Sequence, residues 1–139
     1  MTNEQEPVPM TTPVQRHVQR THPAAWLWLS AAVIALDQAT KFLVTRFFDL
    51  YERVEVLPVL DFTLLHNTGA AFSMFANASG WQRPFFIVLG LAVSLMLAVW
   101  IWRSPRGDKL LPVALALILG GALGNVLDRV RLGYVVDFI

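Results

Sequence analysis

Two long stretches without a charged side chain limit the possible folds of this chain more than any other feature. Pro84–Trp102 has 19 residues and Leu110–Leu127 has 18, and neither contains Asp, Glu, Lys or Arg. As helices they would extend roughly 27 to 29 Å, which matches the hydrocarbon thickness of a bilayer. The sequence therefore predicts transmembrane helices at about 84–102 and 110–128.

A third apolar stretch begins at Ala24 and carries charges in its second half. It continues past Asp37 and Lys41 and remains apolar to Phe48. Its uncharged first half has the length of a signal-peptide core, but no small-residue cleavage pattern follows it closely. A spacing of four residues would place Asp37 and Lys41 on one helix face as an ion pair. We therefore expect a membrane helix at about 24–48 in preference to a cleaved signal peptide.

The segments outside these helices differ in charge, and the difference predicts an orientation. Residues 1–23 contain four of the eight prolines and are expected to form a flexible tail. The link 103–109 is basic, whereas the loop 49–83 contains several acids. Because positive charge favours the cytoplasmic side, the tail and the link are expected there and the loop outside.

The outer loop has a pattern of its own. Apolar and polar side chains alternate at 53–56 and again at 59–64, which predicts short strands in a small sheet. Ala70–Phe75 is a short apolar piece suited to an interfacial helix. The expected fold is an all-α polytopic membrane protein with three transmembrane helices and a small extracytoplasmic β element, in which residues 24–139 form the membrane domain.

Composition excludes several classes of function. Only 15% of the residues are charged and the net charge is +1, so the basic surface of a nucleic-acid-binding protein is lacking. The absence of cysteine excludes disulfides, zinc–thiolate sites and thiol nucleophiles. The three histidines (His17, His22 and His66) lack the spacing of metal ligands. No metal or other cofactor is therefore expected.

Two features inside the predicted helices concern helix association. Asp37, Gln38 and Lys41 lie within about one turn of the first helix. Ionisable groups inside a membrane are costly and mark functional positions, although such a pair can also serve only to hold helices together. In the third helix, Gly120 and Gly124 form a small-xxx-small step that lets another backbone approach closely.

Polar side chains also follow one face of the third helix. Gly121, Asn125, Asp128 and Arg129 are spaced so that they share a helix face leading to the outer membrane surface. This stripe is either part of a functional site or a helix-packing seam whose charges reach water.

Asp137 lies between apolar residues near the end of the chain. Partial desolvation would suit this carboxyl for acid–base work, and the alternative is a solvent-exposed residue of a strand or turn. Two carboxylates that share a proton can activate water and protonate a leaving group, and Asp128 with Asp137 is the obvious pair. However, Arg129 beside Asp128 favours the ionised form of that carboxyl, so Asp128 is expected to be a structural ion-pair member.

Four motifs together resemble those of one family, lipoprotein signal peptidase, also called signal peptidase II. They follow one another in the family's order and cover residues 24–139, leaving out the proline-rich tail. The motifs are Asp37-Gln38-x-x-Lys41, Asn67-Thr68-Gly69-Ala70-Ala71-Phe72, Gly120-Gly121-Ala122-Leu123-Gly124-Asn125-x-x-Asp128-Arg129 and Val135-Val136-Asp137-Phe138.

The resemblance implies an activity and assigns roles to residues. Members are bacterial inner-membrane aspartic proteases with four membrane helices and a periplasm-facing active site, and they remove signal peptides from diacylglyceryl-modified prolipoproteins. Asp137 resembles the first catalytic aspartate. Positions implied to bind substrate are Asn125, Arg129, Asn67 and Gly121. Positions implied to support the site are Asp37, Lys41 and Asp128. Membrane lipids are the other implied partners, and a complete protein is expected to be a monomer.

One departure from the family pattern concerns the catalytic pair. The family's second aspartate lies in an Asn-x-Ala-Asp motif at the start of a fourth helix, and the sequence printed here reaches Ile139 without it. Because one carboxylate cannot act as base and acid at once, this chain alone is expected to be inactive or nearly so.

Two other functions remain as alternatives at this point. The chain is either a non-catalytic membrane module that binds lipidated signal helices, or a structural three-helix subunit in which the pairs Asp37/Lys41 and Asp128/Arg129 fix helix packing. Binding of a lipidated peptide without cleavage would favour the first alternative, and a lack of binding would favour the second.

Overall fold

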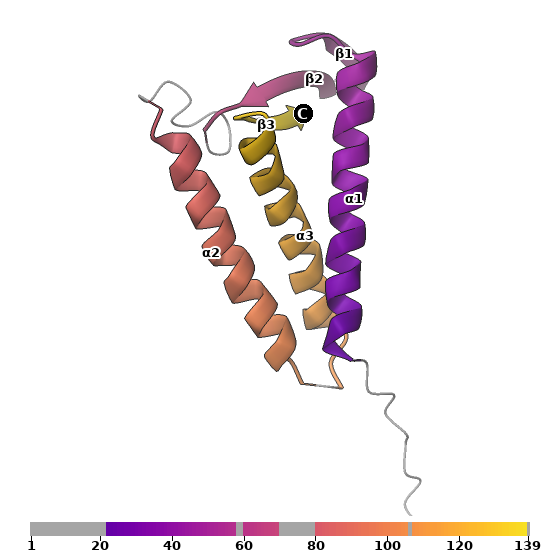
Figure 1. Ribbon diagram of the computed structural model, residues 1–139. Helices are drawn as coiled ribbons and strands as arrows, with labels where there is room; N and C mark the ends of the chain where they lie inside the picture. The colour runs from indigo at the N-terminus through magenta and orange to yellow at the C-terminus, as the bar shows by residue number, and fades with distance from the viewer. Residues whose placement is uncertain (1–21, 58–59, 70–79, 106, 139) are drawn as a thin grey trace, which may run out of the picture.

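Three long helices with a small sheet at one end form the structure, a computed structural model that describes residues 22–57, 60–69, 80–105 and 107–138 (Figure 1). The helices are α1 (Pro23–Phe47), α2 (Gln82–Arg103) and α3 (Leu110–Arg131). Each is long and apolar enough to cross a membrane. The expected polytopic membrane fold is thereby confirmed, whereas the interfacial helix expected at 70–75 lies outside the described residues.

Local sequence determines where the helices begin and end. At the start of α1, His22 Nδ1 accepts a hydrogen bond from the backbone N–H of Ala24 at 3.3 Å, and Pro23 occupies the first turn, where its missing N–H costs nothing. At the end of α3, Gly133 has a φ of +90° and its N–H donates to the carbonyl of Arg129. This left-handed residue ends the helix and redirects the chain towards the sheet.

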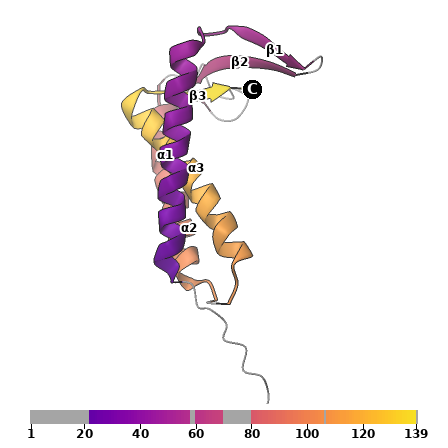
Figure 2. The ribbon, with the colours of Figure 1, turned by 90° about the vertical axis from the view of Figure 1, so that its right-hand side faces the viewer.

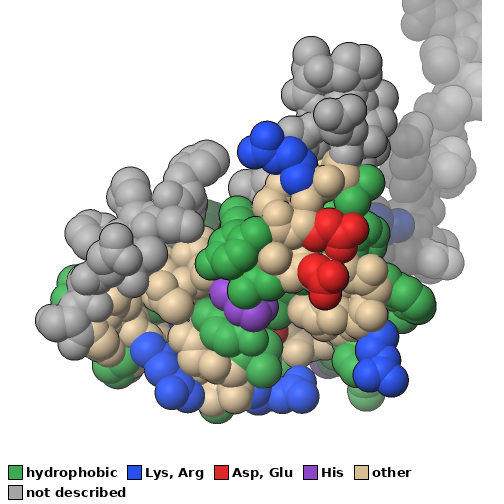
Figure 3. Space-filling view, turned by 90° about the horizontal axis from the view of Figure 1, so that it is seen from above, with side chains coloured by type: hydrophobic (Ala, Val, Ile, Leu, Met, Phe, Trp, Pro, Cys, Tyr) green, Lys and Arg blue, Asp and Glu red, His purple; other side chains and the backbone are tan. Residues whose placement is uncertain are grey.

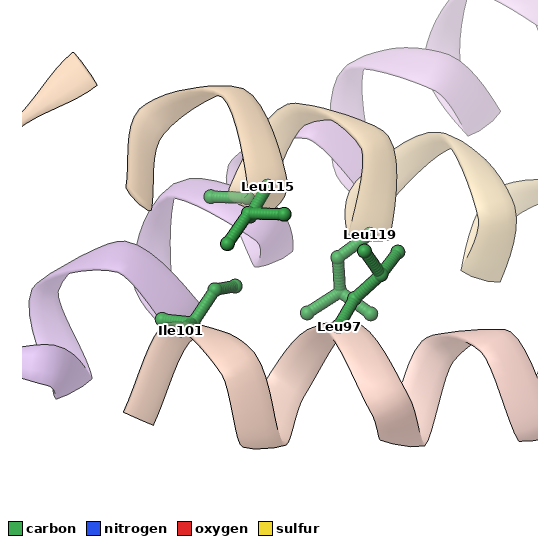
Figure 4. Packing of buried hydrophobic residues seen from close by; sticks show 5 residues of the cluster. Leu97, Ile101, Leu115 and Leu119 are labelled. Carbon is green, nitrogen blue, oxygen red and sulfur yellow. The ribbon is translucent and has the colours of Figure 1, made fainter. Parts of the chain in front are cut away.

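α3 is the central helix of the bundle, with α1 and α2 packed against it (Figure 1). Away from the sheet, α2 and α3 are joined by a cluster of buried apolar side chains. Figure 4 shows Leu97 and Ile101 of α2 pointing towards Leu115 and Leu119 of α3. Ala116 completes this apolar cluster.

The sheet lies across one end of the bundle (Figure 2). Its strands are β1 (Arg53–Leu57), β2 (Leu60–Asn67) and β3 (Val135–Phe138), antiparallel in the order β1-β2-β3. The strands predicted from alternation in the loop are thus confirmed as β1 and β2. β3 pairs Asp137 with Leu65 and Val135 with Asn67. Asp137, near the end of the sequence, is thereby placed next to Asn67, which lies 70 positions earlier.

Polar and apolar side chains are distributed as expected for a protein in lipid. Large apolar side chains on the helix flanks are widely exposed, including Trp28, Leu36 and Leu95. Charged side chains near the sheet are buried instead, with Lys41 7% exposed and Asp128 2% exposed. A bilayer favours apolar surface outside and polar groups inside. The buried charges therefore indicate that the functional site lies at the sheet end of the bundle.

Candidate active site

Asp137 lies on β3, partly buried and held by the pairing of β3 with β2. Asn67 at the end of β2 donates a hydrogen bond from Nδ2 to Asp137 Oδ2 at 3.4 Å. The same amide accepts a bond from the backbone N–H of Gly69 at 2.9 Å, which orients it. Asn67 and Asp137, predicted from separate motifs, are therefore brought into contact.

A cavity of about 360 Å³ surrounds this contact. Its polar lining combines residues from helices α1 and α3 and strands β2 and β3: Asp37, Lys41, Asn67, Asn125, Arg129 and Asp137. Six of the eight predicted site residues thus line one cavity. The other two, Asp128 and Gly121, are not among its lining residues.

Lys41 is the buried centre of an ion network that borders the cavity. Its Nζ lies 3.0 Å from Asp37 Oδ2 and 2.7 Å from Asp128 Oδ2, and it donates to Asn125 Oδ1 at 3.1 Å. The ion pair predicted within the first helix is confirmed. Asp128 from α3 is a second carboxylate on the same ammonium, so this lysine joins α1 to α3.

Asp128 connects the ion network to the strand that carries Asp137. Its Oδ1 accepts a hydrogen bond from Gln38 Nε2 at 2.8 Å, and its Oδ2 accepts the backbone N–H of Val136 at 3.3 Å. Val136 directly precedes Asp137. A carboxylate committed to these donors and to Lys41 fixes the strand, and it is poorly placed to exchange protons with a substrate.

The expected ion pair between Asp128 and Arg129 is wrong. Asp128 pairs with Lys41, whereas Arg129 donates from Nη2 to the carbonyl of Gly69 at 2.8 Å and from Nη1 to the carbonyl of Asn125 at 3.3 Å. Adjacent residues on a helix point about 100° apart, so neighbours in sequence contact different partners. The guanidinium also lies 5.1 Å from the ring centroid of Phe86.

Gly120 and Gly124, which were predicted to allow close helix contact, both pack against α1. A Cβ at Gly120 would lie 2.5 Å from Val33 Cβ and 2.9 Å from the carbonyl oxygen of Ser30, and a Cβ at Gly124 would collide with Asp37. Only glycine permits this approach. Gly121 differs, because a Cβ there would meet no described atom within 4 Å.

Sequence reasoning missed Arg83, in the first turn of α2. Its Nε donates to the carbonyl of Arg129 and its Nη2 to the carbonyl of Val130, both at 2.9 Å. Carbonyls at a helix end lack partners within the helix, and Arg83 supplies a donor to two of them and thereby ties α2 to α3 next to the turn into β3. A single arginine at a helix start gives no sequence signal for such a role.

The assembled groups are suited to hydrolysis of a carbonyl compound. Asp137 is a partly buried carboxylate, Asn67 and Asn125 carry amides, and Arg129 carries a cation, all lining one cavity. A carboxylate can take a proton from water, while amide and guanidinium donors can hold a substrate carbonyl. Among the described residues there is no group of three or more His, Cys, Asp or Glu side chains arranged to hold a metal ion.

Known proteins similar to this chain are described as signal peptidases. The family model described as signal peptidase (SPase) II matches residues 29–139. The lipoprotein signal peptidase of Alteromonas mediterranea is 52% identical over 114 residues, which cover 82% of this chain and 63% of that relative. The lipoprotein signal peptidase of Acinetobacter baumannii is 53% identical over 118 residues, which cover 85% and 67% respectively.

Structural similarity extends to a bacterial membrane enzyme solved by the in meso method at 2.3 Å resolution. It superposes with a TM-score of 0.71 at 29% sequence identity, over 83% of this chain and 68% of that enzyme. The chain thus spans roughly two thirds of the length of the proteins it matches, with 63% for the Alteromonas relative.

Proposed function

This chain belongs to the signal peptidase II family, and we propose that it acts as an aspartic endopeptidase that removes signal peptides from diacylglyceryl-modified prolipoproteins. The observation that carries this proposal is the contact between Asp137 and Asn67 inside a cavity that Asn125 and Arg129 also line. Strand pairing brings Asn67 and Asp137 together at the end of a membrane bundle, next to Asn125 and Arg129 of α3, and a signal helix would present its cleavage site there.

In the proposed reaction Asp137 acts as a general base on water. The Asn67 amide, itself oriented by Gly69, holds the carboxylate through Oδ2. Arg129 also lines the cavity, and its guanidinium would donate to a carbonyl of the bound peptide. Asn125 would add a second polar contact from the same helix.

Hydrolysis by this route needs a second carboxyl group, because the scissile carbonyl must be protonated while water is deprotonated. Among the described residues the other acid that lines the cavity is Asp37, and it is already paired with the ammonium of Lys41 at 3.0 Å. Asp128 is held by the same lysine. We therefore propose that the second catalytic carboxyl comes from outside these 139 residues, as the family's second aspartate motif implies.

Charge at the helix ends bears on the orientation in the bacterial inner membrane. Arg103 and Lys109 lie at the end of the bundle opposite the sheet. Basic residues favour the cytoplasmic side, but Arg46, Arg83 and Arg131 lie at the sheet end, so the periplasmic placement of the sheet and Asp137 rests mainly on the family resemblance. We propose that the enzyme acts there as a monomer.

The test is a cleavage assay with a diacylglyceryl-modified prolipoprotein, followed as a shift on a gel. In the protein as its gene encodes it, Asp137→Asn should abolish cleavage, whereas the exposed, matched acid Glu52→Gln should leave it intact. A polypeptide of only these 139 residues should cleave little or nothing. Cleavage by this polypeptide that persists in its Asp137→Asn form would contradict the mechanism.

A further inference from the structure

A second and larger cavity lies under the sheet, apart from the Asp137 cavity. Its volume is about 420 Å³, within the usual range for small-molecule sites. It shares Lys41 and Val136 with the Asp137 cavity, but its lining does not include Asp137, Asn125 or Arg129. The proposed peptidase chemistry therefore leaves this second cavity without a role.

The second cavity lies where two membrane helices end. Its lining includes Thr45 from the last turns of α1 and Arg131, the final residue of α3. Both helices have the length and hydropathy of membrane spans, so their ends lie at the level where the hydrocarbon of the bilayer gives way to headgroups. Lipid headgroups are therefore expected next to this cavity.

Charges around the cavity are of both signs and close to balance. Lys41 and Asp128 at its floor pair with each other at 2.7 Å, so neither is free to hold a ligand ion. Arg131 and Asp49 remain, and both are exposed to solvent. Arg131 donates one hydrogen bond at 3.4 Å to Gln38 Oε1 among the described residues, which leaves most of its five N–H donors for an anion.

The backbone adds a preference for a cation on the side of Asp49. α1 ends at Phe47, two residues before Asp49. The last carbonyls of a helix have no partners within the helix and carry about half a negative charge together. The cavity thus offers the Arg131 guanidinium to an anion and the Asp49 carboxylate, next to the C-terminal end of α1, to a cation.

The remaining walls are apolar and lead outwards. Phe42 and Leu132 line the cavity and are 64% and 47% exposed, so they continue its wall onto the lipid-facing surface. Figure 3, which looks onto the sheet end, shows basic side chains towards the edges of this face and acidic side chains nearer its middle. A ligand with a charged head and an apolar tail fits this arrangement.

We propose that this cavity binds the headgroup of phosphatidylethanolamine. The phosphate would meet Arg131, and the primary ammonium would meet Asp49 and the carbonyls at the end of α1. The acyl chains would extend past Phe42 and Leu132 into the bilayer. An anionic phospholipid satisfies only Arg131 and is repelled by Asp49, and a choline headgroup lacks the N–H donors that a carboxylate accepts.

Competition between lipids tests this proposal. The protein as its gene encodes it is purified in detergent with an equimolar mixture of phosphatidylethanolamine, phosphatidylglycerol and phosphatidylcholine, and retained lipid is counted by native mass spectrometry. We expect phosphatidylethanolamine to be retained preferentially. Loss of one charge-assisted contact should reduce its retention about fivefold or more in Arg131→Gln and in Asp49→Asn. Arg131→Lys should restore most of it.

Arg46→Gln is the matched control, because Arg46 is an exposed cation in the last turn of α1 that does not line the cavity. It should retain phosphatidylethanolamine as the unmodified protein does. Equal retention of the three lipids, preference for phosphatidylglycerol, or equal losses in Arg46→Gln and Arg131→Gln would overturn the proposal. Displacement of the lipid by a prolipoprotein signal peptide would overturn it as well, by assigning the cavity to the substrate.

Discussion

The two ends of the helix bundle are held by opposite kinds of contact. Far from the sheet, α2 and α3 meet through apolar side chains such as Ile101 and Leu115, whereas near the sheet α1 and α3 meet through Lys41 and its two carboxylates. Lipid tails are as apolar as leucine, so apolar contacts alone select helix partners weakly in a membrane. The ion network forms only when α1 and α3 are correctly oriented relative to each other. Through Asp128 it also holds the strand that carries Asp137.

The largest effect should come from removing the cation of the ion network. Lys41→Met leaves the buried carboxylate of Asp128 and the partly exposed carboxylate of Asp37 without their counter-ion, which should lower the free energy of unfolding by about 3–5 kcal/mol. Unfolding in mixed detergent micelles measures the change. Arg46→Met removes a cation one turn or so further along the same helix, where it is exposed, and should change stability little. Equal losses of stability in the two variants would contradict the stabilising role assigned to the ion network.

A smaller loss is expected from the close contact of α1 with α3. Gly120→Ala places a methyl group against Val33 and the backbone of Ser30. Such overpacking costs about 1–3 kcal/mol, and backbone contact favours the upper part of that range. Gly121→Ala is the matched control, since its methyl group meets open space. A Gly121→Ala protein as unstable as Gly120→Ala would contradict the helix arrangement.

Weakening the apolar end should cost less than breaking the ion network. Ile101 is 1% exposed, and Ile101→Ala should lower the free energy of unfolding by about 2 kcal/mol, the low end of the usual range, because lipid also solvates the separated side chain. Leu110→Ala, at a position 81% exposed, should have almost no effect. Cleavage activity should persist in folded Ile101→Ala. Loss of cleavage in the folded variant would show that the apolar end of the bundle also contributes to the active site.

The smallest expected effect is a pH dependence of the sheet. His66 stacks on Tyr134 with ring centroids 3.9 Å apart, and burial lowers the pKa of His66 below its ordinary value of 6.5. The unfolded chain then binds more protons than the folded one just below pH 6.5, so stability falls as the pH drops through that range and is unaffected above it. His66→Gln should remove this part of the pH dependence, measured by unfolding at about pH 8 and about pH 5. An unchanged profile would exclude His66 as the cause.

Sequence patterns predicted features that lie within one helix or strand. They did not predict contacts between helices and strands. The uncharged stretches predicted the membrane helices, and a four-residue spacing predicted the pair of Asp37 with Lys41. The link from Lys41 to Asp128 crosses between helices, and no spacing within one helix determines how its neighbour is rotated. The same limit explains why Asp128 was paired with Arg129, its neighbour in sequence.

The candidate site was predicted in a similar, partial way. Asp137, Asn67, Asn125 and Arg129 were selected from motifs, and the structure places them around one cavity. The hydrogen bond from the Val136 backbone to Asp128 was not predictable, because backbone donors carry no sequence signature.

The central claim is that two nearby aspartates have separate duties, with Asp137 reacting and Asp128 holding the strand. The most direct test compares Asp137→Asn and Asp128→Asn in the protein as its gene encodes it, measuring both prolipoprotein cleavage and the free energy of unfolding. We expect Asp137→Asn to lose cleavage by about a hundredfold or more with near-normal stability. Asp128→Asn should lose stability, and should keep measurable cleavage in the fraction that is folded. Full stability with complete loss of cleavage in Asp128→Asn would contradict this division.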